Sequence, residues 1–535
     1  MNQQTSVGVA RRLVMALRTH HVEHAVLAPG SRSGPLALAL AAAERQGLLR
    51  LHVRVDEREA GFVALGLAKA SRRLVPVVTT SGTAVANLHP AMLEALHADV
   101  PVLAVTADRP GRLRGTGANQ TTDQRHVFPG IDYADRVTAI TGRLQHLNLE
   151  LDEPLLQAVE WDFPSTGSMG SAWQSTPPVV LKRGLRTVVV AGDDARQPAR
   201  ILARDASWPL LAEPSSGSRN GEALIAYRQL LAHSPLAERI ERVVSFGHAT
   251  LTRPVTRLLA RTDIPIVHVG HQSTFPVPAG PNVSFVDQTL LDSHQTGGAP
   301  VQLGGLAVDG ADNGQWLHAW READARATAA IDALVAGTPY EVARVVNDAV
   351  PPGGLLFVGS SSPVRDLDLV ARPYPVGEKR LIIANRGLAG IDGVLSSAIG
   401  AALARPSSRA IAYVGDLTFL HGSNGLLIGP DEARPDLTIV VASDDGGSIF
   451  STLEQGAPEY VASFERVFAT PTGADIGALC RGYGIAHRLA TPAGLAAELA
   501  EDTPGIRVIE VPVDRRGRRD LDARIAAAVQ AVLRP

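Results

Sequence analysis

The stretch AIAYVGDLTFLHGSNGLLIG, residues 410–429, and the stretch LTIVVASDDGG, residues 437–447, decide the fold. Each begins with an apolar run that is typical of a strand buried on both faces of a parallel sheet. Asp416 follows the first run and Asp444 follows the second, 28 residues later. Ligands of open α/β sheets bind at the carboxyl ends of strands. We therefore expect both carboxylates at one edge of a sheet.

The same alternation of short apolar runs and longer Ala/Leu-rich patterns extends outward through most of the chain. It predicts βαβ units, and hence an α/β fold with parallel sheets covered by helices on both faces. The predicted strands are Ala25–Leu27, Leu51–Val55, Val75–Thr79, Val102–Thr106, Thr187–Val190, Arg242–Ser245, Ile264–Val269, Leu355–Val358, Leu381–Ile383, Ala410–Val414, Leu437–Val441 and Ile506–Val511. The predicted helices are Pro35–Ala43, Gly61–Ala70, Ala84–Ala98, Glu341–Asp348 and Val394–Ala404.

The chain has 535 residues, which is too long for one hydrophobic core. Two breaks divide it: the Pro/Ser/Gly-rich Phe163–Pro178, and residues 297–340, where a Gly-rich stretch precedes a helical pattern. We expect three domains, at residues 1–180, 181–338 and 339–535, of which the first and the last could be similar α/β units.

The composition indicates a folded globular protein, with 45% hydrophobic residues, 20% charged residues and a formal net charge of -3. A nucleic-acid binder would carry a basic excess, so no nucleic-acid partner is expected. The short run Arg515–Arg519 is interpreted as a solvated loop.

The single cysteine, Cys480, excludes an internal disulfide framework and favours a reducing compartment. It falls in an apolar helical pattern and is interpreted as buried packing. The first twenty residues have helical spacing with interspersed arginines, unlike a signal peptide. No apolar run approaches the roughly 18–20 residues of a membrane span. We expect a cytoplasmic protein without a membrane partner.

The two aspartates suit Mg²⁺, which usually combines one or two carboxylates with substrate phosphates and water. Asp416, Asp444 and a backbone carbonyl near Gly446 would complete the shell with two diphosphate oxygens and a water. Gly446 and Gly447 let the backbone approach a ligand closely. Thr418 stands at a predicted helix start, where exposed amides favour phosphate. A strand followed by Gly-Asp is also common as an ordinary structural turn. The prediction of a metal site therefore depends on the presence of both aspartates after neighbouring strands.

This spacing resembles the thiamine diphosphate motif, in which Gly-Asp-Gly is followed, two to three dozen residues later, by Asn-Asn. Leu417 replaces the third motif residue, and Ser443-Asp444 stands where Asn-Asn is usual. Asp444 still offers oxygen but adds a negative charge beside the diphosphate. The departure bears on metal affinity and on its pH dependence.

Thiamine enzymes place an activating glutamate after a strand of their first α/β domain, where it bonds the pyrimidine nitrogen of the cofactor. Here Leu51–Val55 leads into Asp56 and Glu57, so Glu57 is the catalytic candidate. An acidic residue in the first turn of a helix is also favoured by the helix dipole alone. Because Glu57 and Asp416 lie in different domains, the resemblance implies an active site shared by two subunits of an obligate dimer or dimer of dimers.

Further segments make the chain similar to the MenD family, the 2-succinyl-5-enolpyruvyl-6-hydroxy-3-cyclohexene-1-carboxylate synthases of menaquinone biosynthesis. The similarity covers about residues 25–125 and 355–455. It implies thiamine diphosphate and Mg²⁺ as cofactors, with Mn²⁺ as a substitute, and decarboxylation of 2-oxoglutarate followed by 1,4-addition of the succinyl carbanion to isochorismate. The segments are Ala28–Ser33, Asp56–Arg58, Thr80–Leu88, Asp108–Pro110, Gly117–Gln120, Asn385–Gly387, Gly390–Gly393, Gly415–Phe419 and Gly446–Phe450.

Both substrates are dicarboxylates, and Arg pairs with carboxylates in a planar two-point geometry. Four arginines follow predicted strands, although a single Arg there is more often a surface residue. By resemblance, the acceptor or intermediate would contact Ser31, Arg32, Arg109 and Gln120, and the succinyl-side carboxylate would contact Ser361, Arg365 and Arg386. The cofactor would contact Glu57, Ile391, Gly415, Asp416, Leu417, Thr418, Asp444, Gly446, Gly447 and Ile449. Phe450 and Leu453 would wall the substrate pocket; ordinary core packing is the alternative for them and for Ile391 and Ile449.

Three other classes of protein remain as alternatives. Another thiamine enzyme, such as an acetohydroxyacid synthase or a simple 2-oxoacid decarboxylase, usually acts on substrates with one carboxylate. A regulatory protein could bind a nucleotide or diphosphate without catalysis. A Rossmann dehydrogenase is disfavoured because no strand is followed by G-x-G-x-x-G.

Overall fold

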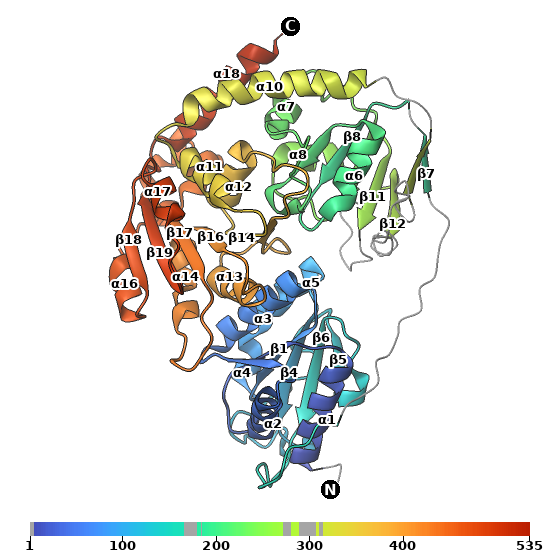
Figure 1. Ribbon diagram of the computed structural model, residues 1–535, viewed down its shortest axis with the longest axis vertical. Coiled ribbons are helices and arrows are strands. Elements are labelled where there is room, and N and C mark those ends of the chain that lie inside the picture. The colour runs from blue at the N-terminus through green and yellow to red at the C-terminus, as the bar shows by residue number, and fades with distance from the viewer. Residues whose placement is uncertain are drawn as a thin grey trace.

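A computed structural model of the chain describes residues 5–164, 179–182, 184–270, 280–287, 306–309 and 314–534. Three separate parallel sheets with flanking helices confirm the predicted α/β fold of three domains (Figure 1). Parts of both predicted breaks, residues 165–178, 297–305 and 310–313, lie outside the described residues.

The N-terminal domain is a six-stranded parallel sheet in the order β2-β1-β3-β4-β6-β5. Its inner strands β1, β3, β4 and β6 are almost entirely buried because helices cover both faces, whereas the edge strands β2 and β5 are partly exposed. The strands are β1 (His24–Leu27), β2 (Arg50–Val53), β3 (Val75–Thr79), β4 (Val102–Asp108), β5 (Asp132–Ala134) and β6 (Gln145–Glu150). The helices are α1 (Ser6–Thr19), α2 (Gly34–Arg45), α3 (Glu57–Ser71), α4 (Thr83–Asn87) and α5 (His89–Ala98).

The C-terminal domain has a second six-stranded parallel sheet in the order β15-β14-β16-β17-β19-β18. Counted along the chain, this is the strand order of the N-terminal sheet, which confirms that the two domains are similar α/β units. The strands are β14 (Leu355–Val358), β15 (Leu381–Ala384), β16 (Ala410–Gly415), β17 (Leu437–Ser443), β18 (Ala486–Leu489) and β19 (Ile506–Pro512). The helices are α11 (Pro339–Ala349), α12 (Ser362–Val370), α13 (Val394–Leu403), α14 (Asp416–His421), α15 (Val461–Phe464), α16 (Ile476–Gly482), α17 (Leu495–Ala500) and α18 (Arg518–Leu533).

The central domain has a five-stranded parallel sheet in the order β12-β11-β10-β8-β9, and β13 (Leu306–Asp309) pairs separately with β7 (Val179–Lys182). The sheet strands are β8 (Thr187–Ala191), β9 (Leu210–Ala212), β10 (Arg242–Phe246), β11 (Ile266–Gly270) and β12 (Val283–Asp287). The helices are α6 (Arg196–Ala206), α7 (Tyr227–His233), α8 (Arg253–Leu259) and α10 (Gln315–Val335). We keep the domain limits near residues 180 and 338 as a proposal.

One helix prediction is wrong, because the structure has two helices where the sequence predicts one. The pattern over residues 84–98 predicts a single helix, but α4 ends at Asn87 and α5 begins at His89. Pro90 is the physical reason, since it has no N–H to donate to the carbonyl of Ala86 and so interrupts the helical hydrogen bonds.

The N-terminal and C-terminal domains of the chain are joined by α3 and α13. A Cβ on Gly66 of α3 would lie 2.0 Å from the carbonyl oxygen of Ser397, and one on Gly400 of α13 would lie 2.2 Å from that of Val63. Only glycine permits backbones to approach so closely. The contact unites the two domains in one apolar core.

The structure also bears on the predictions for Cys480 and for membrane-spanning segments. Cys480 is fully buried on α16 and free, as expected. Among the described helices, none is both long enough and apolar enough to cross a membrane.

Candidate active site

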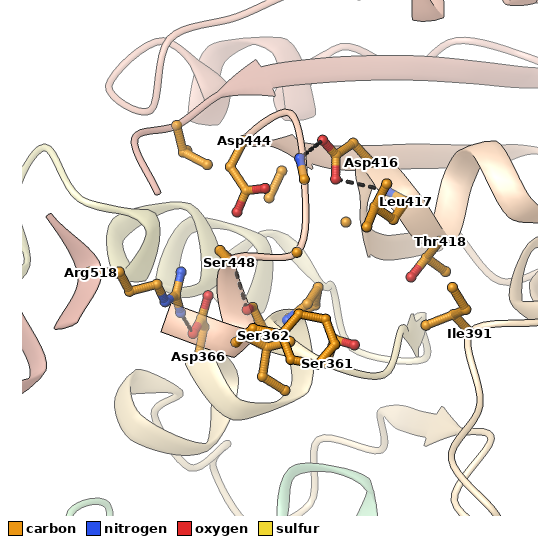
Figure 2. Close-up of a pocket in the computed structure, with 18 residues that line it drawn as sticks. Ser361, Ser362, Asp366, Ile391, Asp416, Leu417, Thr418, Asp444, Ser448 and Arg518 are labelled. Carbon is orange, nitrogen blue, oxygen red and sulfur yellow. Dashed lines mark hydrogen bonds and ion pairs between the residues drawn. The ribbon is translucent and has the colours of Figure 1, made fainter. Parts of the chain in front are cut away.

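A cavity opens at the carboxyl ends of β14, β16 and β17, the edge where the sequence predicts a ligand (Figure 2). It gathers eleven of the predicted site residues: Ser361, Ile391, Gly415, Asp416, Leu417, Thr418, Asp444, Gly446, Gly447, Ile449 and Phe450. Seven further residues line the cavity and were not predicted from the sequence: Ser362, Pro363, Asp366, Ala442, Ser448, Val513 and Arg518.

Asp416 stands at the point where β16 becomes α14. Its side chain is 5% exposed, and its two oxygens accept hydrogen bonds from the amides of Leu417 at 2.7 Å and Gly446 at 2.9 Å. Burial raises the pKa of this carboxyl group, although both amides oppose the shift. The Gly446 bond ties the end of β16 to the loop after β17, so the two halves of the predicted motif are in direct contact.

Asp444 follows β17, which pairs in parallel with β16 as predicted. Its Oδ1 atom is buried and has no hydrogen-bond partner. Burial raises the pKa of Asp444 to about 7; a bond with Ser448 opposes this, and the charge of Asp416 adds to it. The buried carboxylate of Asp416 and the half-buried carboxylate of Asp444 repel each other in this cavity, and a cation between them would restore the charged forms of both.

A metal at this site would need oxygen ligands beyond protein carboxylates. Among the described residues, no group of three or more His, Cys, Asp or Glu side chains could hold a metal ion. Asp416 and Asp444 supply two carboxylates, so phosphate oxygens, backbone carbonyl oxygen or water would have to complete a shell of six.

The opposite wall of the cavity offers hydrogen-bond donors. Ser361 precedes α12 with φ of +66°, an uncommon value for a residue with a side chain, and Ser362 Oγ lies 2.9 Å from Ser448 Oγ. Gly446 has φ of +151°, and a Cβ there would lie 2.4 Å from the carbonyl oxygen of Ala469. Hydroxyl groups and helix-start amides that face a cavity suit the oxygens of a phosphate group.

The interpretation of residues 515–519 as a solvated loop is wrong for two of its arginines. Arg518, 6% exposed, lines the cavity and forms an ion pair with buried Asp366, over the ring of Tyr340. Arg515 donates to the carbonyl oxygens of Asp444 at 2.7 Å and Asp445 at 3.0 Å. The run follows β19 and therefore lies at the same edge of the sheet as Asp416 and Asp444. Its position after a predicted strand could have indicated a role in the site, whereas its composition did not.

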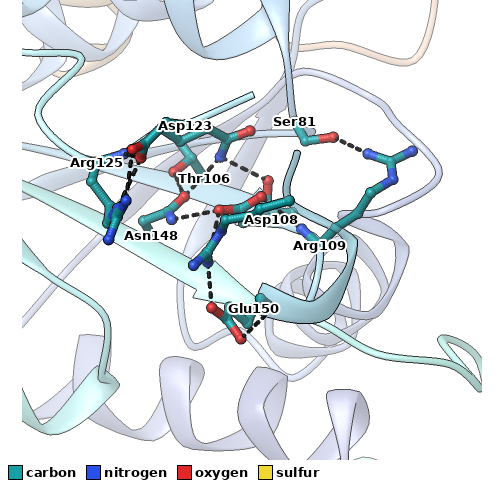
Figure 3. A network of polar contacts seen from close by, with 12 residues as sticks. Ser81, Thr106, Asp108, Arg109, Asp123, Arg125, Asn148 and Glu150 are labelled. Carbon is teal, nitrogen blue, oxygen red and sulfur yellow. Dashed lines mark hydrogen bonds and ion pairs between the residues drawn. The ribbon is translucent and has the colours of Figure 1, made fainter. Parts of the chain in front are cut away.

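A second group of predicted residues lies at the carboxyl edge of the N-terminal sheet. Arg109 Nη1 donates to Ser81 Oγ at 2.6 Å and to the carbonyl oxygen of Gln120 at 2.9 Å (Figure 3). Burial, followed by the charge of Arg32, lowers the pKa of Arg109. Ser31 follows Gly30, where a Cβ would lie 2.3 Å from Thr80. The structure thus brings Ser31, Arg32, Arg109 and Gln120 to one edge.

A buried polar network beneath this edge was not predicted. Asp108, at the end of β4, accepts from Asn148 Nδ2 at 2.9 Å and forms an ion pair with Arg114. Gln124 donates to Asn148 Oδ1 at 2.7 Å and accepts from the amide of Gly82 at 2.9 Å, which fixes the loop that carries Ser81 (Figure 3). Buried polar groups must be paired, so the network gives this loop one conformation.

Glu57 begins α3 and is only partly buried; Asn87 Nδ2 donates to its Oε2 at 3.2 Å. The neighbouring Glu59 points inward instead, where it is 1% exposed and bonded to Ser396 Oγ at 2.6 Å. All residues that line the cavity belong to the C-terminal domain. A single chain therefore does not bring Glu57 into the cavity of Asp416 and Asp444.

Three remaining candidates, Arg365, Arg386 and Leu453, do not line the cavity. Arg365 donates to the carbonyl oxygen of Ser361 at 2.8 Å, and Arg386, 4% exposed, reaches Thr250 Oγ1 at 3.4 Å. Burial, followed by the charge of Arg386, lowers the pKa of Arg365. The carbonyl oxygen of Leu453 accepts from Arg519 at 3.0 Å.

Comparison with known proteins agrees with this geometry. Residues 8–127 match the family model described as thiamine pyrophosphate enzyme, N-terminal TPP binding domain, and residues 368–511 match the corresponding C-terminal TPP binding domain. Three relatives are named 2-succinyl-5-enolpyruvyl-6-hydroxy-3-cyclohexene-1-carboxylate synthase. The protein from Nocardioides sp. is 50% identical over 98% of both chains, that from Kineococcus radiotolerans 44% over 99% of both, and that from Paenarthrobacter aurescens 43% over 99% of this chain and 98% of its own. The chain belongs to the 2-succinyl-5-enolpyruvyl-6-hydroxy-3-cyclohexene-1-carboxylate synthase family of thiamine pyrophosphate enzymes.

Proposed function

We propose that the chain decarboxylates 2-oxoglutarate on thiamine diphosphate and adds the succinyl unit to isochorismate by 1,4-addition, with release of CO₂. The observation that carries the proposal is the cavity of Asp416 and Asp444, in which one buried carboxylate oxygen has no partner. Relatives of this name cover nearly the whole chain, which supports the choice among thiamine enzymes.

The cofactor and Mg²⁺ would be held by different parts of this cavity. Asp416, Asp444 and the backbone at Gly446 are the proposed metal ligands, and Mn²⁺ would be accepted in place of Mg²⁺ because it prefers similar oxygen ligands. The proposed contact of the diphosphate is the hydroxyl and amide of Thr418, and the lack of a side chain at Gly447 lets the backbone come close to it. Ile391 and Ile449 would pack against the organic part of the cofactor. When bound, thiamine diphosphate supplies a nucleophilic carbon and stores the electrons released by decarboxylation.

Glu57 is proposed to come from a second copy of the chain. It starts a helix at the ligand-binding edge of the N-terminal sheet, but the cavity of its own chain does not include it. In an obligate homodimer or dimer of dimers, its carboxyl group would hold a proton against the pyrimidine nitrogen of the cofactor. We further propose a cytoplasmic location, which fits a single, buried and free cysteine.

The two arginine groups are proposed to orient the two dicarboxylates. Arg365 and Arg386, together with Ser361, would bind the succinyl-side carboxylate beside the cavity. On the N-terminal edge, Ser31, Arg32, Arg109 and Gln120 would bind isochorismate, while Phe450 and Leu453 would limit the pocket. Orientation of two bound reactants can lower a barrier by about 7–11 kcal/mol, so positioning would be the main contribution of these side chains.

A two-substrate product assay tests the proposal. The protein, supplied with Mg²⁺ and thiamine diphosphate, should release CO₂ from 2-oxoglutarate and form the coupled product only when isochorismate is present. Preferential decarboxylation of pyruvate would instead favour an acetohydroxyacid synthase-like carboligase or a simple 2-oxoacid decarboxylase. Absence of bound thiamine diphosphate by mass spectrometry, with no turnover of either acid, would reject thiamine chemistry altogether.

A further inference from the structure

The loop between β15 and α13 carries two proposed site residues, Arg386 and Ile391, and is held from outside the C-terminal domain. It runs from Asn385 to Gly393. The ring Nδ1 of His248, in the central domain, lies 3.1 Å from the carbonyl oxygen of Arg386 and can donate a hydrogen bond to it. The N-terminal domain supplies a second and stronger attachment.

That attachment is the carboxylate of Glu94 on α5, which is 4% exposed. Its Oε1 accepts from the amide of Gly387 at 2.6 Å, and its Oε2 accepts from the amides of Leu388 at 2.7 Å and Ala389 at 3.3 Å. Hydrogen bonds to an ionised acceptor are about twice as strong as neutral ones. Three consecutive amides on one carboxylate leave this part of the loop little freedom.

A buried ion pair lies at the same contact between the N-terminal domain and the loop. Lys69 Nζ, on α3, donates to Asp193 Oδ2 of the central domain at 3.0 Å and to the carbonyl oxygen of Ala384, at the end of β15. Both side chains are at most 8% exposed. Burial raises the pKa of Glu94, and the positive charge of Lys69 together with the amides of Leu388 and Gly387 opposes that shift. The backbone on both sides of Arg386 is therefore fixed by residues of the N-terminal domain.

The position of Arg386 matters because another guanidinium group lies nearby. Burial lowers the pKa of Arg365, and the like charge of Arg386 adds to that shift. Two guanidinium groups with like charges stay close to each other only if the backbone that carries them is rigid. A substrate carboxylate bound between them would relieve their repulsion.

We propose that Glu94 is a positioning residue for the 2-oxo acid: by holding the amides of residues 387–389, it places Arg386 where the distal carboxylate of the substrate can meet it. This inference rests on the proposed function, because it requires a dicarboxylate 2-oxo acid. Glu94 does not line the cavity of Asp416 and Asp444, and its carboxylate is occupied by the loop amides. Its effect should therefore appear in substrate affinity rather than in cofactor binding.

The variant Glu94→Gln tests this, since it keeps the size of the side chain but places an NH₂ group against the loop amides. The KM for 2-oxoglutarate should rise about tenfold, while kcat and the Kd for thiamine diphosphate change less than about threefold. Glu44→Gln is the matched control: Glu44 also accepts from a backbone amide, that of Leu51 at 2.8 Å, in the same domain but away from the loop. It should leave all three constants unchanged.

A loop-side variant covers the case in which Glu94→Gln does not fold. In Gly387→Ala the new Cβ would lie 2.6 Å from the carbonyl oxygen of Glu94 and 2.9 Å from the amide of Ala98, so the loop must move off α5. The same rise in KM is expected. With Arg386→Lys as the background, Glu94→Gln should add less than about threefold, because the two changes act on one contact.

Two results would overturn the inference. A parallel loss of kcat, substrate affinity and cofactor affinity with a lower melting temperature would show that Glu94 is only structural. An unchanged KM in both Glu94→Gln and Gly387→Ala would show that the loop does not need this attachment. Failure of the wild-type protein to consume 2-oxoglutarate is a different outcome, which rejects the proposed function itself.

Discussion

Asp416, which is buried, and Asp444, which is half-buried, line one cavity, and burial raises the pKa of both carboxyl groups. The sequence was sufficient to predict that these residues meet, because parallel neighbouring strands bring their carboxyl ends to one edge. It was insufficient for Arg518 and Asp366, whose ion pair joins segments 152 positions apart. Pairing at that separation depends on how α18 packs against the sheet, and no local pattern encodes it.

Replacing Asp444 by Asn should change how metal affinity depends on pH. The pKa of Asp444 is about 7, and a metal binds only the ionised carboxylate. Apparent Mg²⁺ affinity of the wild-type protein should therefore rise as pH increases through 7, whereas Asp444→Asn should respond much less between pH 6 and 8. Titration of Mg²⁺ against bound thiamine diphosphate at several pH values measures this. Equal slopes for both proteins would remove Asp444 from the metal site.

Glu57→Gln should abolish turnover while leaving the protein folded. The side chain is partly exposed and its one described hydrogen bond, from Asn87, is long, so the exchange costs little stability. Loss of a general acid–base group typically lowers rates by about 10²–10⁴-fold. Steady-state kinetics, alongside thermal melting and cofactor binding, gives the comparison. Near-normal activity would exclude Glu57 from the mechanism.

Glu213 makes stability depend on pH. Its side chain is 1% exposed, Oε2 has no partner, and burial raises its pKa to about 8. An unfolded chain releases this proton near pH 4.3, so between these values the folded state binds more protons. The free energy of unfolding should therefore fall as pH rises, by about 1–2 kcal/mol between pH 6.5 and 8.5. Urea unfolding should show a smaller fall for Glu213→Gln; the same fall in both proteins would contradict this origin.

At the scale of elements, sequence pattern succeeded where strands are apolar throughout and failed where they are short or polar. All twelve predicted strands overlap observed ones. Among those missed, β9 has only three residues, β18 is an exposed edge strand, and β6 buries the polar side chains of His146 and Asn148. Those polar residues belong to the network around Asp108, so tertiary hydrogen bonds, rather than hydrophobic periodicity, stabilise β6.

The packing of α3 on α13 provides a test at the same scale. Gly66→Ala would place a Cβ 2.0 Å from a backbone oxygen of the other helix, which cannot move without displacing α13. We expect a loss of about 1–3 kcal/mol, the usual cost of overpacking a core. Thermal melting should show it. Gly482→Ala is the control, because nothing lies within 4 Å of the added atom. Equal melting temperatures would mean that the helices separate easily.

In the whole molecule, the N-terminal and C-terminal domains share one strand order, although the candidate site residues that they carry are different. The sequence indicated this likeness through its alternation of elements. Its predicted cofactor and substrate residues, however, fall into two groups, one at each sheet edge, and one chain does not unite them. We propose that assembly with a second copy of the chain unites the two groups, and no pattern within one chain encodes such an assembly.

Mixing two inactive variants tests this shared site most directly. Glu57→Gln and Asp416→Asn chains, each inactive alone, should form hybrid dimers after co-expression in which one site combines an intact Glu57 with an intact Asp416. We expect recovery of about one quarter of wild-type activity in a statistical mixture, since half of the dimers are hybrid and each restores one of two sites. No recovery in a mixture shown to contain hybrid dimers would contradict it.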